Sequence, residues 1–583
     1  MQRLEFIDRA ARPIPLSLIF LVAFVIHAPL LLMKLPLKSY DTNFHIFFAS
    51  HYSQHWFDPW NPKWYAGFSQ TTYPPLPQQW VALVSKIIGL DMAYMLVQFA
   101  AVLLLALGVY RFSKLWVSAR AAGFAALASV LLGSEAFLVY AAGQLSTTFA
   151  APLYLNALPY LYEWIRWRDW RSLLKGAALA VAAAAAHHAT LLFGSFLFAI
   201  PVLALAIMDV RESRVGSFVF RTVFLAVLVG AMIAVVLLPF WIALIQYPVT
   251  QVPIPHPSRS NYILSPQWGV NYFLIPYGAL ILVLPFIFLR GSSNPRLRPL
   301  LLGFWVAFLL GLGGTTPVAR LLLGRAFEVL TMERFTYWAT LLASPFVGLL
   351  AEELIDRFQW RAAAGLTVAA GLTCAAAVAY ASYRPADAED FKVDSVAAWL
   401  NRDGHDRYRY VTLGFGNKVA RLAVLTNASS VDGEWNSGRM LPELTEHGAG
   451  PLTSSKYFGK AGLDALSAIL QHADRYGLKW VIMKDPYYEP LLVFSGWRRV
   501  DDLENRTISI WTRDSVPPAT PINSPQRPTA WEGVWWGFLP IGSSVLAMLL
   551  VVIPNRRLSD ETVADSPEAH ASHEDLVLGR LIS

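Results

Sequence analysis

Cysteine is almost absent from this 583-residue sequence, in which Cys374 is the single one. A disulfide within the chain is therefore excluded, and a zinc site built from cysteine and histidine is not expected. Internal repeats of the kind that many transporters carry are also missing. We expect the first apolar run not to be a cleavable signal peptide. It follows Arg3, Arg9 and Arg12, and we expect it to remain as a membrane anchor.

Charged residues are also scarce. They make up 15% of the chain, against 55% hydrophobic residues, a balance too apolar for one ordinary soluble domain. The apolar residues are gathered in long runs, and about 20 apolar residues in a helix cross the roughly 30 Å hydrocarbon layer of a bilayer. The sequence therefore predicts a polytopic α-helical membrane protein with about twelve spans. These spans begin near Leu16, Ala93, Ala121, Leu145, Gly176, Leu191, Thr222, Trp268, Leu300, Phe335, Ala362 and Trp531.

Two adjacent histidines interrupt the alanine-rich pair of spans within residues 172–208. His187 and His188 resemble neighbouring metal ligands, but adjacent residues of a helix point about 100° apart. The interpretation we favour is that they line the outer turn of a short hairpin. Loss of this hairpin would leave the orientation of every other span unchanged, because its two spans would disappear together.

Basic residues are distributed unevenly among the loops. They occur in every second loop, which is the positive-inside asymmetry and predicts that both termini are cytoplasmic. The residues that mark these loops are Arg3, Arg9, Arg12, Arg111, Lys114, Arg120, Arg166, Arg168, Arg171, Lys175, Arg211, Arg214, Arg221, Arg290, Arg296, Arg298, Arg357, Arg361, Arg556 and Arg557. The net charge of +7 is thus explained by topology and does not indicate a nucleic-acid partner. We expect a multi-pass protein of the bacterial cytoplasmic membrane.

The composition divides the chain into a membrane core and a soluble part. A helix over 393–400 and another over 463–476, with strands at 408–413, 479–483 and 506–511, predict a small α/β domain outside the membrane. The predicted parts are a core over 1–382 with a large first outer loop at 34–91, the extracytoplasmic α/β domain at 383–515, a proline-rich linker at 516–530, a last span at 531–553 and a disordered cytoplasmic tail at 554–583. Outer loops also follow at 247–267 and 315–334, so the chemistry is expected on the outer side.

The first outer loop holds the most informative pattern. Asp41 and His45 are four residues apart, which places an acid and an imidazole one helical turn apart just beyond the first span. Val81–Ile88 is too short to span and predicts an interfacial helix. Aromatic residues between these two segments suit the headgroup boundary, and they are Trp56, Trp60, Trp64, Tyr65, Phe68 and Tyr73.

These motifs resemble the GT-C superfamily of membrane glycosyltransferases, which use polyprenyl-phosphate-linked sugars. The resemblance rests on the acidic residue that opens the first outer loop, on Pro74–Trp80, and on the layout of the spans. Within the superfamily the sequence is most similar to a bacterial group named for a "6-pyruvoyl-tetrahydropterin synthase-related" membrane domain. That similarity comes from Asp41–His45, Trp60–Trp64 and Tyr73–Leu76. The zinc histidines of a soluble pterin synthase are not present as a cluster.

The resemblance implies an acid–base role for Asp41 on the acceptor nucleophile, with His45 beside it. The leaving group would be a polyprenyl phosphate, which calls for a cation, and arginine offers a planar bidentate donor. Arg334 is the first candidate, at the outer mouth of a span. The wider candidate set for substrate and lipid phosphate adds Glu333, Arg259, Arg320, Tyr73, His187 and His188. The implied partners are a polyprenyl-phosphate sugar donor, membrane lipids and an extracytoplasmic acceptor.

The sequence departs from two relatives within the superfamily. Lipid A aminoarabinose transferases carry lysine before Pro-Pro-Leu, where this chain has Tyr73. Oligosaccharyltransferases carry an Asp-x-Asp metal motif in the first loop, whereas position 43 is Asn43 here. The pattern therefore supports no metal site and no cofactor, and it does not exclude a divalent ion.

Simpler interpretations exist for the same residues. Asp41 could cap the helix that starts at Thr42, Arg334 could anchor a helix at the headgroup layer, and His45 could be a boundary residue. Tyr73-Pro-Pro-Leu could be no more than a helix start. Two further functions remain as alternatives: a transporter or flippase for lipid-linked glycans, and a non-enzymatic assembly or sensor protein that works through its α/β domain.

Overall fold

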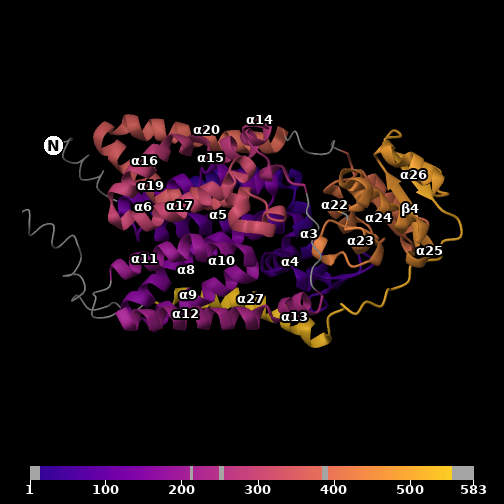
Figure 1. The fold of residues 1–583 in the computed structure, drawn as a ribbon, viewed down its shortest axis with the longest axis horizontal. Helices are drawn as coiled ribbons and strands as arrows, with labels where there is room; N and C mark the ends of the chain where they lie inside the picture. Colours follow the sequence, from indigo (N-terminus) through magenta and orange to yellow (C-terminus); the bar gives the residue numbers. More distant parts are fainter. Residues whose placement is uncertain (1–12, 210–214, 248–254, 384–390, 449, 555–583) are drawn as a thin grey trace, which may run out of the picture.

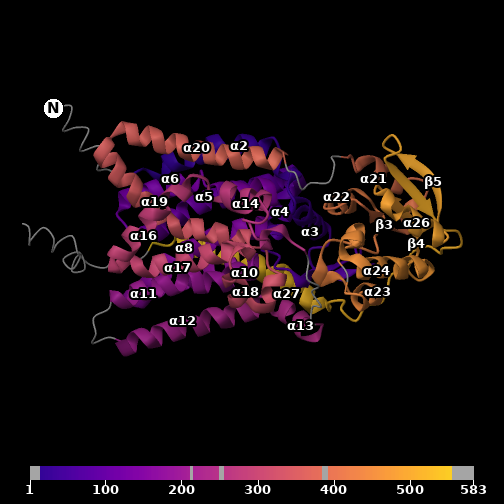
Figure 2. The same ribbon diagram turned by 45° about the horizontal axis from the view of Figure 1, so that its top comes forward.

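The computed structural model describes residues 13–209, 215–247, 255–383, 391–448 and 450–554. The N-terminal basic residues, part of the second outer loop and the predicted tail beyond residue 554 lie outside these ranges. Figures 1 and 2 show a long helical body with a smaller α/β unit, drawn in orange, at one end.

The helical body contains all the apolar helices of the chain that the structure describes. In chain order they are α2 (Leu16–Leu32), α5 (Leu90–Ser113), α6 (Ala119–Ser129), α7 (Gly133–Ala136), α8 (Leu145–Trp167), α9 (Trp170–Ala186), α10 (His188–Gly194), α11 (Ile200–Met208), α12 (Val215–Val236), α13 (Leu238–Gln246), α14 (Pro266–Gly269), α15 (Ile275–Tyr277), α16 (Leu284–Ser293), α17 (Arg298–Gly311), α18 (Val318–Leu323), α19 (Glu333–Phe358), α20 (Trp360–Tyr383) and α27 (Ala530–Val552).

Eight helices within the described ranges are long and apolar enough to cross a membrane. They are Leu90–Ser113, Ala119–Ala142, His188–Met208, Gly216–Val236, Pro266–Ser293, Glu333–Phe358, Trp360–Ala381 and Ala530–Val552. The four other predicted spans are also helical, but α2 and α9 have 17 residues each and α17 has 14, while α8 is more polar. The chain is thus a multi-pass membrane protein by its apolar helices, and the count of about twelve stays a prediction.

The outer helices of the body suit a lipid environment. Few residues of α12 and α20 are buried, whereas most of those in Ala119–Ala142 are. The exposed side chains of α12 include Val219, Phe220 and Val227, which are apolar. Contiguous exposed apolar surface of this kind is expected to face hydrocarbon rather than water.

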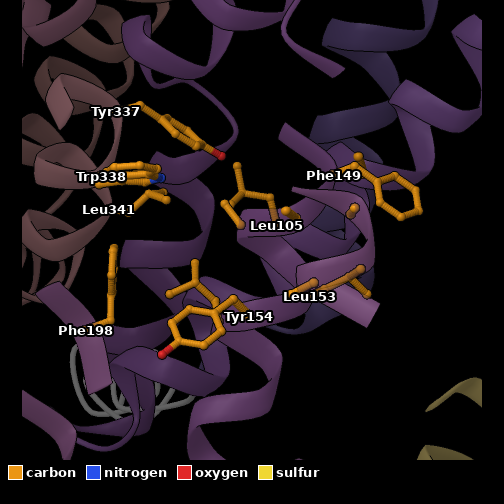
Figure 3. Packing of buried hydrophobic residues seen from close by; sticks show 14 of the residues in the cluster. Leu105, Phe149, Leu153, Tyr154, Phe198, Tyr337, Trp338 and Leu341 are labelled. Carbon is orange, nitrogen blue, oxygen red and sulfur yellow. The ribbon is translucent and has the colours of Figure 1, made fainter. Parts of the chain in front are cut away.

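The centre of the body is α8, which is buried along nearly its whole length and packs between α5 and α9. Figure 3 shows Leu105 of α5, Tyr154 of α8 and Trp338 of α19 within one cluster of buried side chains. Because α8 is covered by protein rather than by lipid, it can carry more polar residues than a lipid-facing span.

The first outer loop is folded rather than extended. It forms η1 (Leu35–Lys38), α3 (Thr42–Gln54), the antiparallel pair β1 (Trp60–Asn61) and β2 (Phe68–Ser69), η2 (Gln70–Thr72) and α4 (Leu76–Ile88). The predicted interfacial helix is the second half of α4. Gly67 lies in the turn that joins the two strands, and its φ of 126° is one that residues other than glycine rarely adopt. Its Cα also packs against the ring of Trp60, which leaves no room for a Cβ.

The prediction that the aromatic residues of this loop lie at the headgroup boundary is wrong for those in the middle of the loop. Trp64, Tyr65 and Phe68 are at most 2% exposed and share one core with the α/β unit. Trp56 instead donates from Nε1 to the carbonyl of Gly537 in α27, at 3.0 Å. Aromatic residues suit a headgroup layer only where nothing covers them, and here the α/β unit does so.

The α/β unit is built on a four-stranded mixed sheet in the order β3-β4-β6-β5, in which β3 and β4 are parallel and the other pairs are antiparallel. Its elements are α21 (Asp394–Leu400), β3 (Arg409–Leu413), α22 (Lys418–Leu425), α23 (Pro442–Glu446), α24 (Gly459–Gln471), α25 (Ala473–Tyr476), β4 (Leu478–Met483), α26 (Glu489–Phe494), β5 (Arg498–Leu503) and β6 (Ile508–Thr512). The three predicted strands match β3, β4 and β6, and β5 was not predicted. The position of this unit on the outer side of a membrane stays a prediction.

Polar contacts dock the α/β unit onto the first loop. Arg421 of α22 holds Asp91 through both terminal nitrogens, at 2.9 and 3.3 Å. The ammonium of Lys63 donates to the carbonyl of Thr426 at 2.7 Å, and the Lys63 carbonyl accepts from the backbone N–H of Ser430 at 2.7 Å. The unit is therefore fixed against the core by both its charges and its backbone.

Gly433 lies where this docking is tightest. A Cβ at this position would lie 2.4 Å from Cδ2 of Trp64, which is fully buried. We expect Gly433→Ala to destabilise the docked unit by about 1–3 kcal/mol, since an overpacked core must shift. Thermal unfolding in lipid nanodiscs measures this. Gly542→Ala is the control, because nothing lies within 4 Å of its added Cβ; equal melting temperatures for the two variants would contradict the prediction.

Candidate active site

Asp41 lies at the start of α3, between the membrane core and the α/β unit. Its backbone N–H donates to the carbonyl of Ala142 at 2.8 Å, and its carbonyl accepts from the N–H of His45 at 3.1 Å, which opens the helix. Its half-buried side chain makes no capping hydrogen bond to α3. The capping interpretation is therefore wrong.

His45 is held one turn further along α3 and is 2% exposed. The amide of Gln78 lies 2.8 Å from Nδ1; with its oxygen turned to the ring, Nδ1–H donates to Gln78, whose nitrogen then donates to the carbonyls of Pro74 and Pro75. Burial lowers the pKa of His45 to about 3, and the charge of Arg334 adds to this effect. A neutral imidazole with so low a pKa is a poor base at neutral pH.

Tyr73 is a half-buried residue on which both charges of the site act. Burial raises its pKa to about 12, a hydrogen bond to Ser146 and the charge of Arg334 oppose this rise, and the charge of Asp41 adds to it. Asp41 and Arg334 therefore both lie within electrostatic range of Tyr73. This indicates that the carboxylate and the guanidinium belong to the same site.

A glutamine holds the arginine in place. Gln144, just before α8, accepts from Nε of Arg334 at 3.1 Å and donates from its own nitrogen to Glu333 at 2.7 Å. Arg334 has no other hydrogen bond to the residues that the structure describes, so its two terminal nitrogens have no partner there. A guanidinium fixed by Nε with a free terminal fork is suited to a phosphoryl group.

The two histidines of the predicted hairpin turn lie within electrostatic range of Arg334. His187 ends α9 in extended backbone and His188 begins α10, which confirms the predicted break between the helices. His187 Nδ1 lies 2.8 Å from the hydroxyl of Thr190, and Nδ1 of His188 is buried without a partner among the described residues. Their ring centroids are 6.0 Å apart.

The two other predicted arginines differ. Arg259 donates to the carbonyl of Phe327 at 3.2 Å; burial lowers its pKa, and the nearby Glu328 and Glu333 act in the opposite direction. It therefore lies beside the cluster. Arg320 is 70% exposed and pairs with Glu328 at 3.0 Å, without any contact to the site among the described residues.

Several residues of the cluster were not predicted. Gln78 lies within the Pro74–Trp80 motif but was not singled out, and Gln144 and Ser146 come from stretches without a motif. Burial lowers the pKa of His256, which lies near Glu333 and Arg334. The α/β unit adds Glu434, which lies near Asp41. A glutamine directly before the polar start of α8 is the one signal that was open to sequence reasoning.

Within the described ranges, no three histidine, cysteine, aspartate or glutamate side chains gather in a way that could hold a metal ion.

No protein-family model matches the sequence, and no curated protein does either. Solved structures do match in fold. The apo oligosaccharyltransferase of Archaeoglobus fulgidus aligns with 86% of this chain and 74% of its own, at 12% identity and a TM-score of 0.53. Apo ArnT of Cupriavidus metallidurans aligns with 85% of this chain and 99% of its own, at 11% identity and a TM-score of 0.51.

The arabinofuranosyltransferase AftD from Mycobacteria matches 86% of this chain at 14% identity and a TM-score of 0.51, and this chain spans 40% of its length. At such identities the likeness concerns the fold alone. The chain therefore shares the fold of these three proteins.

Proposed function

We propose that the protein is a glycosyltransferase that moves a sugar from a polyprenyl-phosphate-linked donor to an extracytoplasmic acceptor. What supports this most directly is that Asp41, which makes no side-chain capping bond to α3, and Arg334, whose Nε donates to Gln144, both lie within electrostatic range of Tyr73. A carboxylate and a guanidinium in one neighbourhood are the two groups that displacement of a phosphate by a hydroxyl needs.

The proposed reaction is a single displacement. The acceptor oxygen attacks the anomeric carbon as Asp41 takes its proton, and the bond between that carbon and the phosphate oxygen breaks. The electron pair leaves on the phosphate, whose charge Arg334 stabilises. Attack from the face opposite the leaving group inverts the anomeric centre. His45 stays neutral and accepts hydrogen bonds through Nε2.

The fold relatives support this class. Two of them are named for sugar transfer, one as an oligosaccharyltransferase and one as an arabinofuranosyltransferase. The former has also been solved with a tethered acceptor peptide, and ArnT, which shares the fold, has been solved with undecaprenyl phosphate. We also propose that the protein lies in the bacterial cytoplasmic membrane, with both termini in the cytoplasm and the α/β unit on the outer side. We further propose that it is related to the pterin-synthase-related group.

A discharge assay tests the proposal. Purified protein in nanodiscs receives a radiolabelled lipid extract of host membranes as donor and delipidated envelope material as acceptor. We expect label to leave the polyprenyl-phosphate pool and to become covalently attached to acceptor. Label that crosses the bilayer of a proteoliposome while it stays on its lipid would instead indicate a flippase.

We expect Gln144 to affect binding of the donor phosphate indirectly, because it orients Arg334. We expect Gln144→Ala to weaken undecaprenyl phosphate binding about 3- to 10-fold, because the guanidinium loses the acceptor that orients Nε, worth about 1 kcal/mol. Gln144→Glu restores an acceptor for Nε but places a second carboxylate beside Glu333, so it should restore little. Binding of undecaprenol, which has no phosphate, is the control and should be the same in all forms. Equal losses for both lipids would contradict a role through the phosphate.

A further inference from the structure

A short segment of the α/β unit reaches into the site. The indole of Trp435 donates to the hydroxyl of Thr72 at 2.9 Å, and its ring meets that of Tyr73 edge-on with centroids 4.9 Å apart. Gly433 and Gly438 lie flat against Trp64 and Phe68 of the first loop, so close that neither leaves room for a Cβ. Glu434 lies between Gly433 and Trp435, so the contacts of these two neighbours fix its position.

Glu434 has neither a hydrogen bond nor an ion pair to any residue that the structure describes, although it is half-buried. Burial raises its pKa well above the usual range, and the carboxylates of Asp41 and Asp432 raise it further. Asp432 is 2% exposed; one of its oxygens accepts from the N–H of Thr453 at 3.2 Å, and the other has no partner there. The buried oxygen of Asp432 is therefore unsatisfied, and Glu434 is unpaired beside it; a hydroxyl-bearing ligand would complete the hydrogen bonds of such carboxyl groups.

We propose that Glu434 is an acceptor-binding residue, so that the α/β unit completes the active site by holding a hydroxyl of the acceptor against Asp41. This inference rests on the proposed function. It assigns the segment around Glu434 to the acceptor and leaves the donor phosphate to Arg334.

The position of Glu434 favours the acceptor over the donor. The groups assigned to the donor all belong to the membrane core, and they are Arg334, Gln144 and Glu333. Glu434 belongs to the α/β unit and lies near Asp41. The oxygens of a carboxyl group accept hydrogen bonds, which the hydroxyl groups of a sugar can donate. Trp435 adds an indole ring beside it, and aromatic side chains with a few placed polar groups are typical of ligand sites. The chemistry therefore fits a hydroxyl-bearing acceptor such as a glycan.

The test separates acceptor from donor. Full-length protein in nanodiscs is assayed with the labelled lipid extract and increasing amounts of delipidated envelope glycan, and binding of undecaprenyl phosphate is measured separately. For Glu434→Ala we expect the half-saturating glycan concentration to rise about tenfold, as for loss of a hydrogen bond in a buried site. The dissociation constant of undecaprenyl phosphate should stay within about twofold.

Two further variants guard against a folding defect. Glu434→Gln keeps the side-chain volume and part of the hydrogen bonding, so it should raise the half-saturating concentration less than the alanine does. Glu446→Gln changes an exposed glutamate of the same unit and should behave as wild type.

The inference is overturned if Glu434→Ala saturates with glycan as wild type does, or if it weakens undecaprenyl phosphate binding to the same extent. Wild-type protein that leaves the donor intact would instead overturn the proposed function, and this inference with it.

Discussion

Asp41→Asn should lower the rate of sugar transfer by about 10²- to 10⁴-fold, which is what a positioned general base contributes. Asparagine has nearly the same shape but cannot take the acceptor proton. Because the Asp41 side chain makes no capping bond to α3, the substitution should leave the fold intact. Initial rates in the discharge assay, at saturating donor and acceptor, measure the effect.

The controls for this variant lie in the same chain. Asp394→Asn changes an exposed aspartate of α21 and should transfer sugar at the wild-type rate. Binding of undecaprenyl phosphate should be nearly unchanged in Asp41→Asn, since the phosphate is assigned to Arg334. Folded Asp41→Asn protein with an undiminished rate would exclude Asp41 as the base.

The apolar pattern of the sequence predicted most helix positions, because burial in lipid and burial in protein both select apolar runs. The number of spans could not be derived from the same pattern. Because other helices cover α8 and α17, these two need neither the length nor the hydropathy of a lipid-facing span. In the α/β unit, the strands with apolar runs were recognised. The strand β5, Arg498–Leu503, is largely charged and lies at the sheet edge, so it has no apolar pattern.

The site was predictable only where it is local. Asp41 and His45 lie on one helix, so their spacing indicated that they belong together. Gln144 and Arg334 are 190 residues apart in sequence, and Glu434 belongs to a different structural unit from Asp41. No periodicity encodes such contacts. The prediction of a headgroup position for the first-loop aromatic residues was wrong for the same reason. The sequence does not show that the α/β unit covers them.

Arg334→Ala should weaken binding of undecaprenyl phosphate about 10- to 100-fold, since a hydrogen bond to a charged group contributes about 1.5–3 kcal/mol and each 1.4 kcal/mol is about tenfold. Arg334→Lys keeps the charge but not the planar fork, nor the Nε–H that Gln144 accepts, so it should recover only part of the affinity. Arg320→Ala is the matched control, because Arg320 is 70% exposed and pairs with Glu328 at the surface. Affinities measured in nanodiscs, with undecaprenol as the phosphate-free lipid, decide the matter. If Arg334→Ala and Arg320→Ala bind undecaprenyl phosphate equally well, Arg334 is a helix anchor and the phosphate is held elsewhere.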